Sequence, residues 1–333
     1  MTEKLTYRKS ILFVAPRFYN FENNLKEEME HQNYNVDLIS YSYGSHRLPW
    51  KKEKLRRKIA AESSSVIQLI NINHYDILFV IKGELLDKEI INSFKNKNPS
   101  AITIIYLWDS LDNVPFDIDY VNCFDFKYSF DQVECNNYRN HNLQHKPLFY
   151  TNDFEMSNNS QLKYDFSMVG GMQDKRIKVL KQFVKLLPEY KYKIRLRTEI
   201  TLNIPFNIIK FGICTYFNYA LYKNLDRKAV AALLNASKAI LDFTGSRQSG
   251  LSIRTIETLA AGRKLITTNP EVKKYDFYNA NNIYVLEDLE PKKIKEFMER
   301  KFEPVNKNTI IKYSIENFVS TILKNIHVEY LNV

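Results

Sequence analysis

Cysteine, glycine and long apolar runs are all scarce in this sequence of 333 residues. It has three cysteines, Cys123, Cys135 and Cys214, and no two of them have the close spacing of a zinc or redox motif. The 8 glycines exclude a collagen-like repeat, and no stretch approaches the ~20 apolar residues of a membrane-spanning helix. The first apolar run, residues 11–15, is too short for a signal-peptide core. We therefore expect a globular protein that is made and kept in the cytoplasm.

Positive charge, in contrast, is in excess. The 48 Lys and Arg residues outnumber the 38 Asp and Glu residues, which gives a net charge of +10. Such a surplus favours an anionic partner, whether nucleic acid, phospholipid headgroups or a phosphorylated substrate. The length fits two domains, because one domain typically has about 100–200 residues.

Short apolar runs alternate with longer amphipathic stretches, which is typical of parallel sheets covered by helices on both faces. In the first half we expect strands at 10–15, 36–40, 77–81, 103–107 and 126–129 and helices at 22–31, 54–72, 87–97 and 131–140. After a segment rich in Asn and Ser, we expect strands at 165–169, 193–196, 239–243, 264–267 and 282–285 and helices at 176–187, 227–236 and 252–261. The sequence therefore predicts an α/β protein with two Rossmann-like doubly wound domains, residues 1–152 and 153–307, and a helix within 308–333.

Polar and charged residues follow the predicted strands, at the edge where open parallel sheets bind their ligands. In the first domain this group comprises Arg17, Lys82, Glu84, Trp108, Asp109 and Asp131, and in the second Gly170, Gly171, Arg176, Arg197 and Arg247. We expect these residues to converge on a cleft between the domains.

The most informative segment is 242–269, in which a strand leads through a loop with two glycines into a helix that starts near Ser252. The free backbone N–H groups and the positive dipole end of this helix suit a phosphate group. Arg254 lies in the first turn and can add a charge-assisted contact to the phosphate. Glu257 shares a helix face with Arg254 and suits the paired hydroxyls of a ribose; an ion pair between the two on the surface is the alternative.

Residues 249–262, SGLSIRTIETLAAG, resemble the donor-binding motif of bacterial polysaccharide and lipopolysaccharide glycosyltransferases of the glycosyltransferase-B fold, including the CgeB-like and group 1 types. Residues 164–171, followed by Arg176, resemble the opening of their second domain. The resemblance implies two Rossmann-like domains that face a central cleft and a donor that we take to be a UDP-sugar. It also implies a last helix that crosses back to the first domain; a helix that closes its own domain is the alternative. Together with Arg197 and Arg247, which lie after the predicted strands, the resembling residues give the candidate donor site: Gly170, Gly171, Arg176, Arg197, Arg247, Ser249, Gly250, Leu251, Ser252, Arg254 and Glu257.

One departure from the family concerns the stereochemistry of transfer. Retaining members often carry a second Glu eight residues before the one that Glu257 matches, and this sequence has Ser249 there. Retention and inversion therefore both stay open.

Sugar transfer also needs an acceptor site and, for inversion, a base. Asp109 and Glu84 are the candidate catalytic carboxylates, although each would also serve to start the segment that follows it. Trp108 has a ring suited to the face of a sugar, and with Arg17 and Asp131 it forms the candidate acceptor site.

A metal ion has weak support. Asp117 and Asp119 have the spacing of a metal-binding pair but lie in a loop after Pro115. We expect positive side chains to neutralise the diphosphate instead, with no metal and no cofactor besides the nucleotide-sugar cosubstrate.

The basic run at residues 50–58 has six positive residues and one negative residue, together with Trp50 and Leu55. It would suit the anionic inner face of a plasma membrane, where lipid-linked acceptors lie; a solvated helix face is the alternative.

The sequence thus predicts a hexosyltransferase that uses a nucleotide sugar to extend a glycan or lipid-linked acceptor in capsule, lipopolysaccharide or exopolysaccharide synthesis. One alternative is a basic nucleic-acid-binding protein, but no RNA-binding signature is visible, so we expect no nucleic-acid partner. Another is a catalytically idle, carbohydrate-binding member of the same fold.

Overall fold

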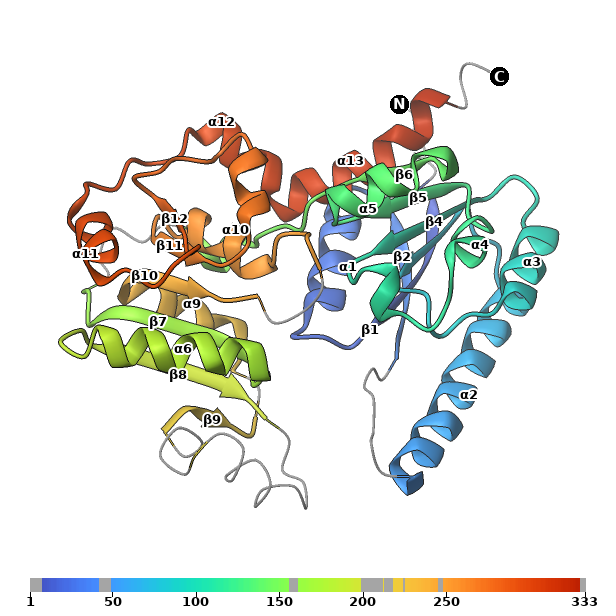
Figure 1. The fold of residues 1–333 in the computed structure, drawn as a ribbon. Coiled ribbons are helices and arrows are strands. Elements are labelled where there is room, and N and C mark those ends of the chain that lie inside the picture. The colour runs from blue at the N-terminus through green and yellow to red at the C-terminus, as the bar shows by residue number, and fades with distance from the viewer. Residues whose placement is uncertain are drawn as a thin grey trace. The chain divides into compact units, whose positions relative to one another are not determined.

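The computed structural model describes residues 8–41, 49–155, 161–198, 212, 218–223, 225–244 and 248–329. The chain forms two compact units, Met1–Pro147 with Ile315–Val333 and Leu148–Ser314 (Figure 1). Arg247 and the side chains of residues 50–57 lie outside what the structure describes.

The first unit contains a six-stranded parallel sheet with the strand order β2-β1-β3-β4-β5-β6. Its strands are β1 (Ser10–Pro16), β2 (Asn35–Tyr41), β3 (Ile77–Ile81), β4 (Ile102–Leu107), β5 (Phe126–Ser129) and β6 (Leu143–His145). Its helices are α1 (Phe21–His31), α2 (Pro49–Ile72), α3 (Lys88–Lys97), α4 (Ile118–Val121), α5 (Gln132–Asn137) and α13 (Ile315–Glu329). The strand order reverses between β1 and β3, which makes the carboxyl ends of these two strands the expected ligand-binding edge.

Both faces of this sheet are covered, so its central strands are apolar throughout. Every residue of β3 is buried, as expected for a parallel strand that is covered on both faces. Leu78 and Val80 share a core with Val66 of α2 and Phe94 of α3. On the other face, Tyr106 of β4 meets Phe318 of α13 edge to face, with ring centroids 4.9 Å apart.

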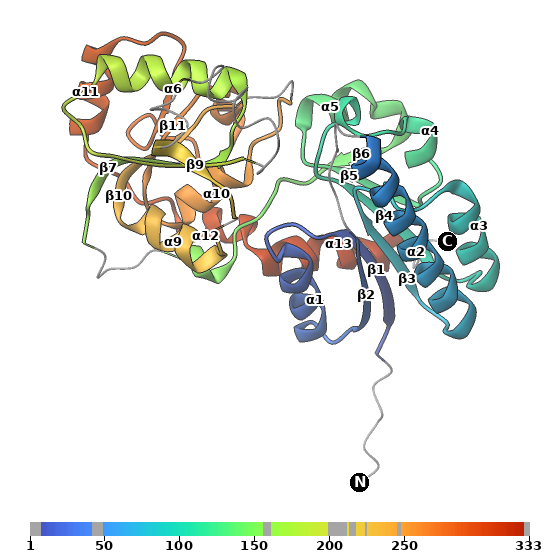
Figure 2. The same cartoon turned by 90° about the horizontal axis from the view of Figure 1, so that it is seen from below.

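Helix α13 is joined to the first unit by polar contacts as well as by this apolar packing. Lys146 Nζ lies 3.1 Å from Thr321 Oγ1 and 3.3 Å from Asn317 Oδ1. Gln32, at the end of α1, donates to the carbonyl of Glu316 at 3.0 Å. Figures 1 and 2 both show α13 beside α1. The chain thus returns to the first unit after it has built the second.

The second unit also contains a six-stranded parallel sheet, in the order β12-β11-β10-β7-β8-β9. Its strands are β7 (Tyr164–Gly171), β8 (Tyr192–Arg197), β9 (Ala220–Leu221), β10 (Ser237–Asp242), β11 (Lys264–Thr267) and β12 (Ile283–Val285). Its helices are α6 (Asp174–Leu186), α9 (Arg227–Asn235), α10 (Ile253–Ala260), α11 (Pro291–Glu299) and α12 (Lys307–Ile310). If β7 to β12 are numbered 1 to 6, the strand order is 3-2-1-4-5-6, as in a dinucleotide-binding sheet. The strand order reverses between β7 and β10.

Helices cover both faces of the second sheet too. Phe166 and Leu241 pack with Leu180 of α6 and Phe297 of α11. Val230 and Leu234 of α9 pack on Ile240 from the opposite face, and Ile256 of α10 packs with Leu265. This arrangement positions the start of α10 at the carboxyl end of β10.

The elements differ from the predictions in three places. The sequence predicts a turn at Gly170 and Gly171, but the structure continues β7 through both residues. One helix is predicted at the end of the chain, but α12 and α13 are separated by a 3₁₀ turn and by Ser314, whose ψ of 158° is extended. Strands β6 and β9 and helix α4 are not predicted, because elements of two to four residues give no periodic signal. Helix α11, which has nine residues, is not predicted either.

None of the helices that the structure describes combines the length and the apolar character needed to cross a bilayer.

Candidate active site

Arg176 hydrogen-bonds to the carboxyl ends of both β7 and β10, the two strands between which the strand order of the second sheet reverses. Its Nη1 donates to the carbonyl of Gly171 at 2.6 Å, and its Nε donates to the carbonyl of Phe243 at 2.8 Å. A Cβ on Gly170 would lie 3.1 Å from Nη1, so the glycine makes room for the guanidinium. The structure thus brings Gly170, Gly171 and Arg176 together at this edge.

The start of α10 is fixed by side chains at the same edge. Ser252 is the N-cap residue, and its Oγ accepts the N–H of Thr255 at 3.3 Å. Asp242, the last residue of β10, accepts hydrogen bonds from the hydroxyls of Ser252 at 2.5 Å and Thr255 at 2.9 Å. The cap satisfies one of the first N–H groups of the helix, and the other N–H groups of the first turn carry the positive end of the helix dipole.

The loop before α10 is held by a residue that the sequence did not single out. Asn269 is buried, and its Nδ2 donates to the carbonyls of Ser249 at 2.9 Å and Gly250 at 3.2 Å. Leu251 is buried in the apolar core beneath the helix. The loop that leads into the first turn of α10 is therefore held by these contacts, and it contains Ser249, Gly250 and Leu251.

Arg254 and Glu257 form an ion pair, as the alternative interpretation predicted, but the pair is not on the surface. Arg254 Nη1 lies 2.5 Å from Glu257 Oε2, and the side chain of Glu257 is only 2% exposed. Arg254 Nε is buried without a hydrogen-bond partner. A buried pair in the first turns of a helix requires compensation from its surroundings, because isolated buried charges are costly.

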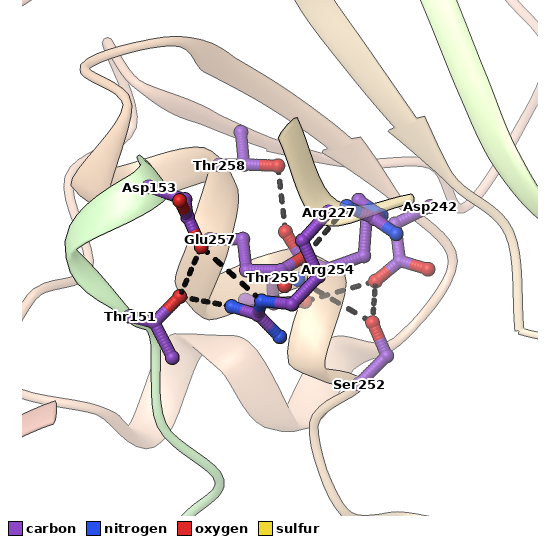
Figure 3. Close-up of polar contacts among 9 residues, drawn as sticks. All are labelled: Thr151, Asp153, Arg227, Asp242, Ser252, Arg254, Thr255, Glu257 and Thr258. Carbon is purple, nitrogen blue, oxygen red and sulfur yellow. Dashed lines mark hydrogen bonds and ion pairs between the residues drawn. The ribbon is translucent and has the colours of Figure 1, made fainter. Parts of the chain in front are cut away.

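That compensation comes from Arg227 of α9 and from the segment before β7 (Figure 3). Arg227 hydrogen-bonds to the hydroxyl of Thr151, and its Nε lies 3.4 Å from Asp153 Oδ2. Its guanidinium also stacks over the ring of Phe154 at 5.1 Å. The result is a cluster of two arginines and two carboxylates, in which Arg227 and Glu257 are buried and Asp153 is exposed. We call it the arginine cluster: Asp153, Arg227, Arg254 and Glu257.

Burial and charge act in opposite directions on this cluster. Burial raises the pKa of Glu257 above its ordinary value, and the charges of Arg254 and Arg227 oppose that rise. Burial likewise lowers the pKa of Arg227, opposed by Glu257 and Asp153. Each group therefore depends on its partners to keep its charge inside the protein.

Arg197 lies at the carboxyl end of β8, where its neighbour across the sheet is Leu221 of β9. Its Nη1 donates to the carbonyl of Thr198. It therefore shares the edge with Arg176.

In the first unit, the two candidate catalytic carboxylates lie on either side of a buried lysine. Lys82 Nζ is 2.6 Å from Asp109 Oδ2 and 3.5 Å from Glu84 Oε1, and the Lys82 side chain is 1% exposed. Burial raises the pKa of Glu84, and Lys82 opposes that rise. Lys82 was predicted only as a strand-end residue, with no role assigned.

The other first-unit candidates have structural contacts. Arg17 donates to the side chain and the carbonyl of Ser40, at 3.0 and 2.7 Å, beside the edge strand β2. Asp131 is buried and caps α5 by accepting the N–H groups of Val133 and Glu134. Asp117 caps α4 in the same way.

Within the described ranges, no three His, Cys, Asp or Glu side chains gather as a metal ion would require.

The fold matches solved structures of sugar-transferring enzymes. One is AviGT4, a glycosyltransferase involved in avilamycin A biosynthesis (TM-score 0.64, 10% identity, 95% of this chain and 96% of that chain). Another is the sucrose-phosphate synthase of Thermosynechococcus elongatus (TM-score 0.63, 9% identity, 98% of this chain and 100% of that chain). A third is Anabaena HepE in complex with UDP and glucose (TM-score 0.58, 10% identity, 96% of this chain and 100% of that chain).

No protein family model and no curated protein sequence matches the chain. At identities near 10%, the structural likeness establishes architecture. The chain has the glycosyltransferase-B fold, with two Rossmann-like domains, and the predicted fold is confirmed. The narrower resemblance to the CgeB-like type stays a prediction.

Proposed function

We propose that this protein is a glycosyltransferase that moves a hexose from a UDP-sugar to a glycan or lipid-linked acceptor without a metal ion. We also propose that it acts in the synthesis of a bacterial capsule, lipopolysaccharide or exopolysaccharide. The observation that carries the proposal is the buried Arg254–Glu257 pair in the first turns of α10, at the edge where a sheet of dinucleotide-binding order reverses. The UDP complexes known for HepE, which shares the fold, are consistent with a UDP-linked donor.

In this proposal the first turn of α10 binds the donor diphosphate. Backbone N–H groups and the helix dipole stabilise the charge that builds on the leaving group, and Arg254 adds a cationic contact. Glu257 accepts hydrogen bonds from the ribose hydroxyls. Asp242 and Asn269 keep the helix start and its loop in place.

Calorimetry with UDP, GDP, CMP and ADP tests the donor assignment. We expect UDP to bind, and we expect Glu257→Gln to weaken UDP binding about 10- to 100-fold, because a hydrogen bond to a charged acceptor contributes roughly 1.5–3 kcal/mol. The same substitution should change the affinity for 2′-deoxy-UDP less, since that ligand lacks one of the hydroxyls that would donate a hydrogen bond to Glu257.

Glu271→Gln is the matched control, because Glu271 lies in the same unit but pairs with the exposed Lys274. Failure of all four nucleotides to bind would remove the proposed function. An equal loss of UDP and 2′-deoxy-UDP affinity in Glu257→Gln would remove the ribose role and leave Glu257 as a support for Arg254.

Product formation separates an active enzyme from a catalytically idle, carbohydrate-binding protein of the same fold. Incubation with radiolabelled UDP-hexose should release UDP and label an acceptor if the protein is a transferase. UDP binding without any turnover, including hydrolysis, would favour the idle alternative.

We also propose that the protein associates with the inner face of the plasma membrane. The basic run at residues 50–58 lies on α2, which projects from the first unit in Figure 1. Six positive residues near an anionic surface would each contribute roughly 1 kcal/mol. Co-sedimentation with vesicles of phosphatidylglycerol but not phosphatidylcholine is the expected result, and equal binding to both would contradict it.

A further inference from the structure

The edge of the first sheet at which its strand order reverses contains strained backbone. Outside glycine and asparagine, the described residues with a left-handed backbone are Tyr19, with φ 51°, and Lys82, with φ 68°. Tyr19 follows β1 and Lys82 follows β3, the two strands between which the order reverses. Side chains with a Cβ avoid this conformation, and where it is held against its cost it often marks a functional site.

Aromatic side chains gather at the same edge. Phe18 lies 4.6 Å from Tyr19 and 5.6 Å from Trp108, and Phe21 lies 5.9 Å from Trp108, all centroid to centroid and all edge to face. We call Phe18, Tyr19, Phe21 and Trp108 the aromatic platform. It joins the segment after β1 to the segment after β4, which lie on either side of β3.

The platform is held in place but is only partly covered. The N–H of Phe18 donates to the carboxylate of Glu22 at 3.2 Å, and Phe21 is buried as the first residue of α1. Phe18 nevertheless remains 37% exposed, and Trp108 is half-buried. Ordered aromatic rings that stay exposed at a ligand-binding edge mark a recognition surface.

Two carboxylates favour a sugar over a lipid chain: Asp109, next to Trp108 in the sequence, and Glu84, which shares Lys82 with Asp109. Asp109 directly follows Trp108, and its carboxylate is 28% exposed although it pairs with Lys82. Glu84, which also pairs with Lys82, has a side chain that is 15% exposed. A sugar ring presents C–H groups to an aromatic face and hydroxyls to carboxylates, whereas an acyl or prenyl chain would cover these partly exposed carboxylates with apolar groups and offer them no hydrogen-bond donor.

We infer that Phe18 and Trp108 bind a sugar ring of the acceptor, with Asp109 and Glu84 accepting hydrogen bonds from its hydroxyls. This inference rests on the proposed function only in naming the ligand as the acceptor. It assigns the acceptor to the saccharides and adds Phe18 to the residues that recognise it.

Intrinsic fluorescence tests this inference directly, because the sequence has two tryptophans, Trp50 and Trp108. In a Trp50→Phe background, all tryptophan emission comes from Trp108. The probes are the methyl glycosides of glucose, galactose, mannose and N-acetylglucosamine and the disaccharides maltose, cellobiose and lactose. Concentrations reach roughly 50 mM, since a contact with one or two rings gives millimolar affinity.

We expect at least one saccharide to shift the emission of Trp108 with a saturable dependence on concentration. Phe18→Ala should then weaken that saccharide roughly threefold to tenfold, the loss of one aromatic contact. The control is Ile72→Ala, which removes an apolar side chain of the same unit that is 66% exposed. It should leave the affinity unchanged.

UDP binding, measured on the same samples, separates this inference from the proposed function. Saturable UDP binding with no saccharide response, or with an affinity that Phe18→Ala leaves unchanged, would overturn the platform and leave the transferase proposal intact. A saccharide response without nucleotide binding would support the platform and remove the transferase. A shift of Trp108 with phosphatidylglycerol vesicles but with no saccharide would overturn the platform in favour of a lipid ligand.

Discussion

Replacing Arg227 by alanine is expected to lower the free energy of unfolding by about 2–4 kcal/mol, somewhat less than the cost of removing one partner from a fully buried ion pair, because the Asp153 side chain is 30% exposed. The Arg227 side chain is 9% exposed, and its loss removes contacts with Thr151, Asp153 and the ring of Phe154. Glu257 is then left buried with Arg254 as its remaining cation. Because the cluster is shared, the damage should extend to the start of α10.

Chemical denaturation measures this effect. The control is Lys238→Ala, whose exposed pair with Asp165 should contribute about 1 kcal/mol or less. A loss for Arg227→Ala no larger than that of the control would show that the arginine cluster does not stabilise the second unit. Arg227→Lys should be intermediate, since it retains the charge but loses the planar, forked donor.

The same variant should also change the pH dependence of stability. Burial raises the pKa of Glu257, so the folded state binds a proton more tightly there than the unfolded chain does. Stability from this group is therefore present below the unfolded pKa of about 4.3 and is lost as pH rises through the folded pKa. Removing Arg227 raises the folded pKa further, so Arg227→Ala should lose more stability than the parent protein between mildly acidic and neutral pH.

Replacing Lys82 by alanine is expected to cost about 2–4 kcal/mol, somewhat less than a fully buried pair because the Asp109 carboxylate is 28% exposed. The substitution leaves Glu84 and Asp109 near each other without the cation between them. Glycine at the same position should be less destabilising than alanine by about 1 kcal/mol, because the φ of 68° is left-handed. That order is the reverse of the usual one, in which glycine is the more costly residue.

Denaturation of Lys82→Ala, Lys82→Gly and the control Lys95→Ala checks this prediction, since Lys95 forms an exposed pair with Asp125. Burial raises the pKa of Glu84, so its contribution to stability falls as pH rises through its folded pKa. Loss of Lys82 should therefore be better tolerated in acid than at neutral pH. A penalty that does not depend on pH would indicate that Lys82 acts by packing alone.

Much of this architecture is predictable from sequence because buried parallel strands give continuous apolar runs. Residues 77–81 and 264–267, for example, are predicted as strands with the bounds that the structure gives them. The start of α10 is also predictable to within a residue, since Ser252 is a favoured N-cap residue in front of an amphipathic helix. In both cases the signal is local.

The residues that hold the site together are not predictable in this way. Arg227 resembles an ordinary surface arginine at the start of a helix, and its burial depends on Thr151 and Asp153, more than 70 positions earlier. Lys82 and Asp109 meet only because β3 and β4 are neighbours in the sheet. The apparent turn at Gly170 and Gly171 extends the strand instead, since Gly170 makes room for Arg176. Such pairings depend on tertiary contacts that hydrophobic periodicity does not report.

The return of α13 to the first unit has a consequence for biosynthesis. A ribosome releases Leu148–Ser314 as one uninterrupted stretch, so every strand of the second sheet is available before α13 has been translated. Until then Tyr106 lacks its partner Phe318, and Lys146 lacks Asn317 and Thr321. Domains usually mature in the order in which they are synthesised. Here we expect the second unit to complete its core first, because the first unit lacks α13 until the end of translation.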